Sequence, residues 1–293
     1  MTKNYRIGVL QLELNNTPEK NRLKCTEWIK KAAKQGAEVI CFPELYSSHY
    51  FCQSEDIENF NYAESFDGIS FQTFAALAKE LGVTLIIPFF ERKMAGLYYN
   101  SALIIDEKGN LNGLYRKMHI PDDPHFYEKF YFTPGDLGFQ NFKTKKANLG
   151  VLICWDQWYP EAARITSLKG SEVIFYPTAI GWHPAEKAQH GKLQQQAWMN
   201  AMKGHAVSNG IYIAAANRIG LEKYLPNTDG LEFWGSSFIA GPQGEILAQA
   251  SEDKEEILLA EVDLSHQEYV RQNWPFFRDR RVDVFGDLTQ RAL

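Results

Sequence analysis

The 293-residue sequence predicts an α/β protein with a four-layer αββα sandwich, built from two internally similar halves. The first observation is an internal repeat, because residues 36–45 (GAEVICFPEL) return as residues 170–179 (GSEVIFYPTA). The second is the alternation of apolar strand-like runs with amphipathic helical segments, which is typical of sheets covered by helices. Two sheets that carry helices on one face and pack together through the other satisfy both observations.

Each copy of the repeat occupies the same place in a β-α-β order. In the first half, the strand Ile7–Leu12 is followed by the helical segment Asn21–Gln35. In the second half, the strand Leu149–Cys154 is followed by the helical segment Glu161–Lys169. Because the order is shared, we expect the two halves to fold alike.

The similarity continues through a third strand and a hairpin. Val83–Phe89 (VTLIIPF) resembles Ile211–Asn217 (IYIAAAN), and each follows a helical segment that ends near a glycine. Tyr99–Tyr115 and Gly235–Gln249 are then two hairpins of alternating strands with glycine-containing turns at matching places. No linker rich in Pro, Gly or Ser divides the chain, so residues 1–293 are expected to form a single domain.

The composition narrows the possible functions. Hydrophobic residues make up 45% of the chain and charged residues 23%, which is ordinary for a globular protein. The net charge is -5 and no polybasic run occurs, so we expect no nucleic-acid partner and no anionic membrane surface. Neither a signal peptide nor an apolar stretch near the roughly 18 residues of a membrane span is present, which predicts a cytoplasmic protein.

One of the four cysteines has a distinctive setting. Cys25, Cys41, Cys52 and Cys154 form no CxxC pair, and their spacing suits neither a zinc site nor a disulfide framework. Cys154 ends an apolar strand shortly before Pro160, which is a typical first residue of a helix. Open α/β sheets present reactive groups at such turns, and a nearby helix N-terminus or cation favours the thiolate. The alternative is a buried cysteine at a strand end.

Two charged residues follow strands at points where the halves differ. Glu44 lies at the end of the strand Val39–Phe42, and its counterpart in the second half is Thr178. A carboxylate in this position can act as a general base. Lys117 ends the first hairpin, where an ammonium can stabilise a developing oxyanion. The alternative for Glu44 is a helix or loop cap, and the alternative for Lys117 is a solvated surface lysine.

A fourth candidate, Glu128, lies in the long loop Pro121–Gly135. This loop is too aromatic for a simple solvated connector, and long loops in compact domains are often functional. Glu128 could hold Lys117 or the substrate, or could form a purely structural ion pair. No histidine has a spacing that marks it as the partner of a cysteine.

Three segments together resemble the nitrilase superfamily of carbon–nitrogen hydrolases: Phe42–Glu44 (FPE), Arg116–His119 (RKMH) and Gly150–Asp156 (GVLICWD). They occur in the order and at the spacing of that family, and the resemblance spans essentially the whole chain. It implies a catalytic triad of Glu44, Lys117 and Cys154, with Glu128 matching a further acidic residue of many members. It also implies that no metal or organic cofactor is needed, and that the protein is a homo-oligomer. The tail Trp274–Leu293, rich in aromatic residues and arginines, is expected at the subunit interface.

The resemblance further implies the reaction. It implies an amidohydrolase that converts the ureido-amine N-carbamoylputrescine to putrescine, carbon dioxide and ammonia through a thioester-type intermediate. Because the far end of this substrate is a cation, its pocket requires carboxylates or aromatic faces. The expected substrate-binding residues are Tyr50, Trp155, Asp122, Asp123 and Trp182. Asp156 and Glu186 are further acidic residues near the motifs.

Two alternatives stay open. A β-ureidopropionase, or another ω-amidase or carbamoylase, would keep the triad and change only the far end of the pocket. A protein of a different class, a non-catalytic nitrilase-like scaffold, would bind partners through its aromatic tail. The presence of all three triad residues argues against the scaffold.

Overall fold

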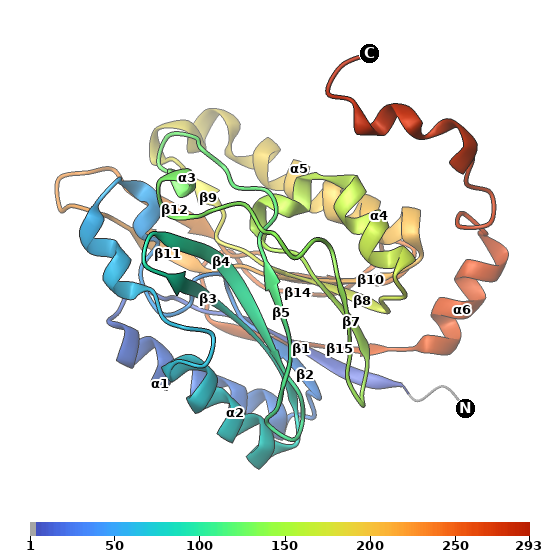
Figure 1. Ribbon diagram of the computed structural model, residues 1–293, viewed down its shortest axis with the longest axis horizontal. Coiled ribbons are helices and arrows are strands. Elements are labelled where there is room, and N and C mark those ends of the chain that lie inside the picture. The colour runs from blue at the N-terminus through green and yellow to red at the C-terminus, as the bar shows by residue number, and fades with distance from the viewer. Residues whose placement is uncertain (1–3) are drawn as a thin grey trace.

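The strands form two large sheets that lie face to face in the computed structural model, which describes residues 4–293 (Figure 1). The helices α1 (Pro18–Lys34) and α2 (Ile69–Leu81) cover the outer face of one sheet. The helices α4 (Pro160–Leu168) and α5 (Pro184–Asn209) cover the outer face of the other. These layers confirm the predicted αββα sandwich. Residues 1–3 of the predicted single domain lie outside the described part.

The first sheet has six strands in the order β15-β1-β2-β3-β4-β5. Their bounds are β1 (Tyr5–Gln11), β2 (Val39–Cys41), β3 (Thr84–Met94), β4 (Leu97–Ile105), β5 (Leu111–Arg116) and β15 (Glu256–Val262). The strands β1, β2 and β3 are parallel and connected through α1 and α2, whereas β4 and β5 add antiparallel neighbours. The last strand, β15, returns from the second half and pairs antiparallel with β1.

The second sheet repeats this arrangement in the order β14-β13-β10-β8-β7-β6. Its strands are β6 (Asn141–Lys143), β7 (Asn148–Val151), β8 (Val173–Pro177), β10 (Tyr212–Ala216), β13 (Phe238–Ala240) and β14 (Ile246–Gln249). Here β7, β8 and β10 are parallel and connected through α4 and α5. The repeat in the sequence therefore corresponds to two halves of the same topology.

The second half also contains a small sheet that the repeat did not predict. It consists of β11 (Ile219–Glu222), β12 (Leu231–Trp234) and β9 (Gly181–Trp182), in that order. All its pairings are antiparallel. The strands lie beyond the carboxyl ends of β8 and β10, so this sheet extends the edge at which the predicted site residues occur.

Short helices and a terminal segment complete the chain. They are α3 (Glu128–Tyr131), α6 (Leu264–Asn273), and the 3₁₀ turns η1 (Phe51–Gln53), η2 (Ile57–Tyr62), η3 (Cys154–Trp158), η4 (Val282–Val284) and η5 (Gly286–Thr289). The tail beyond α6 runs alongside the sandwich and is largely exposed (Figure 1). Its place at a subunit interface stays a prediction. Over residues 4–293, no helix has the length and apolarity needed to cross a membrane.

Strand β1 contributes side chains to two separate hydrophobic cores. Ile7 and Val9 of β1 pack in the core between the sheets, which also contains Phe175 of β8. Leu10, on the opposite face of β1, packs in the core beneath the helices together with Phe74 of α2. Successive side chains of a strand point to opposite faces, so both faces of β1 must be apolar. This explains the continuous apolar runs in the sequence.

The close packing of β7 against α4 yields a test of this fold. A Cβ added at Gly150 of β7 would lie 2.5 Å from Cγ2 of Thr166 and 3.0 Å from Cγ1 of Ile174. We expect Gly150→Ala to lower the free energy of unfolding by about 1–3 kcal/mol, because the core must shift. Denaturant-induced unfolding measures this change.

The matched control is Gly204→Ala in α5, where a Cβ would meet no atom within 4 Å. Alanine suits a helix better than glycine, so this variant should be about 0.5–1 kcal/mol more stable than the wild type. Equal unfolding free energies for the two variants would contradict the packing described.

Candidate active site

The four residues predicted for the chemistry are buried at one edge of the sandwich. Glu44 follows β2, Lys117 follows β5, Glu128 begins α3 and Cys154 begins η3. Their exposed fractions are 0% for Glu44, 1% for Lys117, 0% for Glu128 and 5% for Cys154. Because β2 and β5 end at the same edge of the first sheet, the carboxylate of Glu44 and the ammonium of Lys117 can meet there.

The ammonium of Lys117 lies between two carboxylates. Its Nζ donates to Oε1 of Glu44 at 2.9 Å and to Oε2 of Glu128 at 2.5 Å. Asn100 Nδ2 also donates to Oε1 of Glu44 at 2.7 Å, and the Tyr50 hydroxyl donates to Oε1 of Glu128 at 2.7 Å. Both oxygens of Glu128 are therefore bound. Within residues 4–293, Oε2 of Glu44 has no hydrogen-bond partner, so this oxygen can accept a proton.

Burial and the neighbouring charges determine the protonation states. Burial alone lowers the pKa of Lys117, but the charges of Glu128 and Glu44 outweigh it and raise that pKa well above its usual range. Burial raises the pKa of Glu128 to about 7, against the opposing effect of Lys117. Burial, reinforced by the charge of Glu44, raises the pKa of the Cys154 thiol well above its usual range. The thiol therefore needs a base to become a nucleophile, and Lys117 stays protonated.

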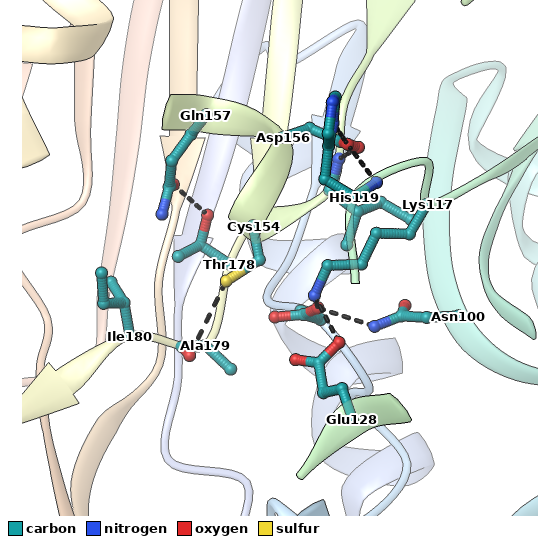
Figure 2. A network of polar contacts seen from close by, with 12 residues as sticks. Asn100, Lys117, His119, Glu128, Cys154, Asp156, Gln157, Thr178, Ala179 and Ile180 are labelled. Carbon is teal, nitrogen blue, oxygen red and sulfur yellow. Dashed lines mark hydrogen bonds and ion pairs between the residues drawn. The ribbon is translucent and has the colours of Figure 1, made fainter. Parts of the chain in front are cut away.

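Cys154 occupies a sharp turn between β7 and η3. Its φ of 41° lies in the left-handed region, which residues other than glycine seldom adopt. Its Sγ lies 3.8 Å from the carbonyl oxygen of Ala179 (Figure 2). In the same view Lys117 and Glu128 extend toward the cysteine from the opposite side. Cys154 and Glu128 also line the same cavity.

Asp156 connects this turn to the strand end that carries Lys117. Its Oδ2 accepts from the backbone N–H of Ile153 at 3.0 Å and from the Tyr115 hydroxyl at 2.7 Å. Its Oδ1 accepts from the backbone N–H of His119 at 3.0 Å and lies 2.7 Å from Nδ1 of that ring. Asp156 is fully buried and does not line the cavity. Its carboxylate is occupied in holding the turn, so it does not supply a charge for the substrate.

A cavity of about 550 Å³ lies above Cys154. Its walls include the aromatic residues Phe126, Trp155, Trp158 and Trp234. The carboxylates of Asp123 and Glu186 also line it, as do His125 and His183, whose rings stack with centroids 4.7 Å apart. Among the described residues, no lysine or arginine lines the cavity. Its chemistry suits an uncharged or cationic ligand.

Of the five residues expected to bind substrate, the structure places two at the cavity and three elsewhere. Trp155 and Asp123 line the cavity. Tyr50 is fully buried and hydrogen-bonded to Glu128, so it supports the charged cluster from behind. Asp122 and Trp182 are not among the lining residues. Trp182 instead donates its Nε1 to the carbonyl of Gly191 at 2.8 Å and packs against a wall residue, Trp234.

The site also contains residues that the sequence analysis missed. Asn100 occupies the place in the first hairpin that Gly235 occupies in the second, so the same departure from the repeat that indicated Glu44 could have indicated Asn100. Trp158 and Trp234 gave no such signal, because tryptophan in an apolar context is usually a core residue. The role of Arg218, described below, depends on contacts between distant segments.

Comparison with known proteins defines the class of protein. Residues 6–272 match the family described as carbon-nitrogen hydrolase. The chain therefore belongs to the carbon-nitrogen hydrolase family, which confirms the resemblance to the nitrilase superfamily. It is an enzyme class that breaks carbon–nitrogen bonds.

Individual relatives are similar over nearly their whole length. The chain is 42% identical to N-carbamoylputrescine amidase of Oryza sativa subsp. japonica, with 96% of this chain and 93% of that protein covered. It is 39% identical to a citrullinase of Francisella tularensis, with coverages of 98% and 99%. A crystal structure of a carbon-nitrogen hydrolase from Helicobacter pylori G27 superposes with a TM-score of 0.95 at 45% identity, covering 99% and 100% of the two chains.

The raised pKa of Glu128 predicts a pH-dependent stability. Between the ordinary glutamate pKa of 4.5 and about 7, the folded state binds more protons at Glu128 than the unfolded state does. The wild type should therefore lose stability as pH rises through this window. The isosteric Glu128→Gln removes the titration, so its unfolding free energy should rise relative to the wild type by about 1–3 kcal/mol from pH 4.5 to 7.

Denaturant-induced unfolding at a series of pH values measures the difference. The control is Glu27→Gln, an exposed glutamate on α1, which should follow the wild-type curve at every pH. Parallel curves for Glu128→Gln and the wild type would show that Glu128 does not titrate in this window.

Proposed function

We propose that the protein hydrolyses N-carbamoylputrescine to putrescine, carbon dioxide and ammonia. The observation that carries this proposal is the cavity above Cys154, which combines tryptophan walls with Asp123 and Glu186 and lacks lysine and arginine among the described residues. Carboxylates and aromatic faces favour the cationic end of such a substrate and disfavour a carboxylate in the same place. The relatives named N-carbamoylputrescine amidase, at 42% identity, support the same substrate.

The first half of the reaction uses the free oxygen of Glu44. That oxygen takes the proton of Cys154, and the thiolate attacks the ureido carbonyl carbon. The Lys117 ammonium and the backbone N–H of Trp155 stabilise the oxyanion of the tetrahedral intermediate. The carbon–nitrogen bond then breaks, Glu44 returns the proton to the leaving nitrogen, and ammonia departs. A carbamoyl thioester remains on Cys154.

The second half regenerates the cysteine. Glu44, now ionised, takes a proton from water as the water attacks the thioester carbonyl. The carbon–sulfur bond breaks, the thiol recovers its proton, and the released carbamate decomposes to carbon dioxide and the amine. Glu128 keeps the Lys117 ammonium in place through both halves with its hydrogen bond of 2.5 Å.

Two further expectations accompany this proposal. The exposed apolar residues of the tail, among them Trp274 and Leu288, support an intersubunit contact in a homo-oligomer. The four cysteines are buried free thiols, which supports a reducing, cytoplasmic location.

The nucleophile is tested with Cys154→Ala. We expect ammonia release from N-carbamoylputrescine to fall by about three orders of magnitude or more, because no other group can form the thioester. The matched control is Cys25→Ala, a buried thiol on α1, which should retain nearly the wild-type rate. Circular dichroism checks that both variants are folded.

The substrate panel contains N-carbamoylputrescine, N-carbamoyl-β-alanine and citrulline. N-carbamoylputrescine should have the highest kcat/KM of the three, because N-carbamoyl-β-alanine and citrulline each carry a carboxylate. A clear preference for N-carbamoyl-β-alanine would favour a β-ureidopropionase and end the polyamine proposal. No ammonia from any ureido compound or simple amide would favour the non-catalytic scaffold.

Recognition of the distant ammonium is tested at the cavity acids. The double variant Asp123→Asn with Glu186→Gln should raise KM for N-carbamoylputrescine about 3- to 30-fold, which corresponds to about 0.3–1 kcal/mol for each exposed charge. Its kcat should change little, because neither residue touches the reacting carbon. The control is Asp122→Asn, since Asp122 is adjacent in sequence but does not line the cavity. An equal rise in KM for the control would contradict the proposed role of the cavity acids.

A further inference from the structure

A second buried ion pair lies directly behind the charged cluster. Arg218 follows β10 and Glu222 ends β11, and Arg218 Nη1 lies 2.8 Å from Oε1 of Glu222. The side-chain exposed fractions are 0% for Arg218 and 1% for Glu222. A buried ion pair is costly unless its remaining donors and acceptors are also satisfied. Its other hydrogen bonds therefore indicate what it holds.

The guanidinium of Arg218 binds the main chain that carries Glu44. Its Nη2 donates to the carbonyl oxygen of Glu44 at 2.7 Å and to that of Leu45 at 3.1 Å. Its Nη1 also lies 3.4 Å from the carbonyl oxygen of Ser48. Leu45 has a φ of 48°, in the left-handed region that a leucine seldom adopts. The arginine thus stabilises a turn that the local sequence does not favour, and this turn orients the Glu44 side chain.

The carboxylate of Glu222 reaches the other end of the same segment. Its Oε2 accepts from the backbone N–H of Tyr50 at 2.5 Å. The hydroxyl of Tyr50 donates to Glu128, and Glu128 in turn accepts from Lys117. One ion pair from the second half of the chain therefore anchors the segment at Glu44 and at Tyr50, and through them both carboxylates that bind Lys117.

The ion pair also connects this segment to the cavity wall. Glu222 belongs to the small sheet, whose other strands contribute Gly181 and Trp234 to the lining. Within the described part of the first half, from residue 4 onward, no equivalent of this sheet occurs. Through Glu222, this sheet of the second half holds the segment of the first half that carries Glu44 and Tyr50.

We propose that Arg218 is a positioning residue for Glu44, and that Glu222 positions Tyr50 and Glu128 in the same way. Neither residue is among those that line the cavity, and the pair acts by fixing where the two carboxylates meet Lys117. The activity readout of this inference rests on the proposed function. The rate at which chloroacetamide alkylates Cys154 does not, because alkylation requires the thiolate of Cys154 but no turnover of a ureido substrate.

The test compares Arg218→Met, Arg218→Lys and Glu222→Gln in the full-length protein. Arg218→Met should lower kcat for N-carbamoylputrescine and the alkylation rate of Cys154 by about tenfold or more, with KM changed less than about threefold. Arg218→Lys keeps the charge but not the planar fork, so it should recover part of both rates. Glu222→Gln retains an acceptor for Tyr50 and should show a smaller loss.

The matched control is Arg271→Met. Arg271 likewise donates to backbone carbonyls, those of Asn209 and Gly210, but far from the cavity. Its loss should lower the melting temperature and leave kcat and the alkylation rate unchanged. Mass spectrometry locates the alkylated cysteine, and circular dichroism establishes that each variant is folded.

Folded Arg218→Met with wild-type kcat and wild-type alkylation would overturn the proposal, since the pair would then serve stability alone. If Arg218→Met does not fold, wild-type rates in both Arg218→Lys and Glu222→Gln overturn it equally. If the wild type hydrolyses no ureido compound, the proposed function fails, and the alkylation rates still decide whether Arg218 positions Glu44.

Discussion

The buried ammonium of Lys117, held between Glu44 and Glu128, is the interaction on which the site depends. An unpaired charge at this depth would be strongly unfavourable, so each of the three groups requires the others. Burial raises the pKa of Glu128 to about 7, against the opposing charge of Lys117 and with a further contribution from the charge of Glu44. Among the residues that the structure describes, Oε2 of Glu44 has no hydrogen-bond partner, so it is open to the proton of Cys154.

The cluster exists only because both halves of the fold contribute to its support. The first half supplies the two glutamates and the lysine, and the second half supplies the turn that carries Cys154. Asp156 joins this turn to the strand end that bears Lys117 through three contacts, one with Tyr115 and two with His119. The duplicated fold thus brings two strand-end loops together, after which the halves have diverged in the residues that they place there.

The residues proposed to carry out the reaction and those proposed to select the substrate lie in different parts of the site. The groups proposed to make and break bonds are buried, and of these Cys154 lines the cavity whereas Glu44 and Lys117 do not. Burial and neighbouring charges raise the pKa of Cys154, and neighbouring charges raise the pKa of Lys117. The acids at the cavity wall, Asp123 and Glu186, are exposed. Asp123 lies in the loop before α3, and Glu186 lies in the first turn of α5. A carbon-nitrogen hydrolase can therefore change its substrate by altering exposed wall residues without disturbing the buried cluster.

The sequence by itself determined the layered fold and the residues nearest the chemistry. Apolar alternation and the internal repeat are local patterns, and the departure from the repeat at Glu44 indicated a functional position before any contact was known. Only the tertiary structure decided that Asp123 lines the cavity and its neighbour Asp122 does not, and that Asp156 holds a turn rather than facing the substrate. The sequence also did not predict the small sheet or the hydrogen bond of Arg218 to the carbonyl oxygen of Glu44. The physical reason is that these side chains take their direction from distant segments. The contacts of Asp156 with Tyr115 and His119 span 41 and 37 residues, and the hydrogen bond of Arg218 to Glu44 spans 174 residues.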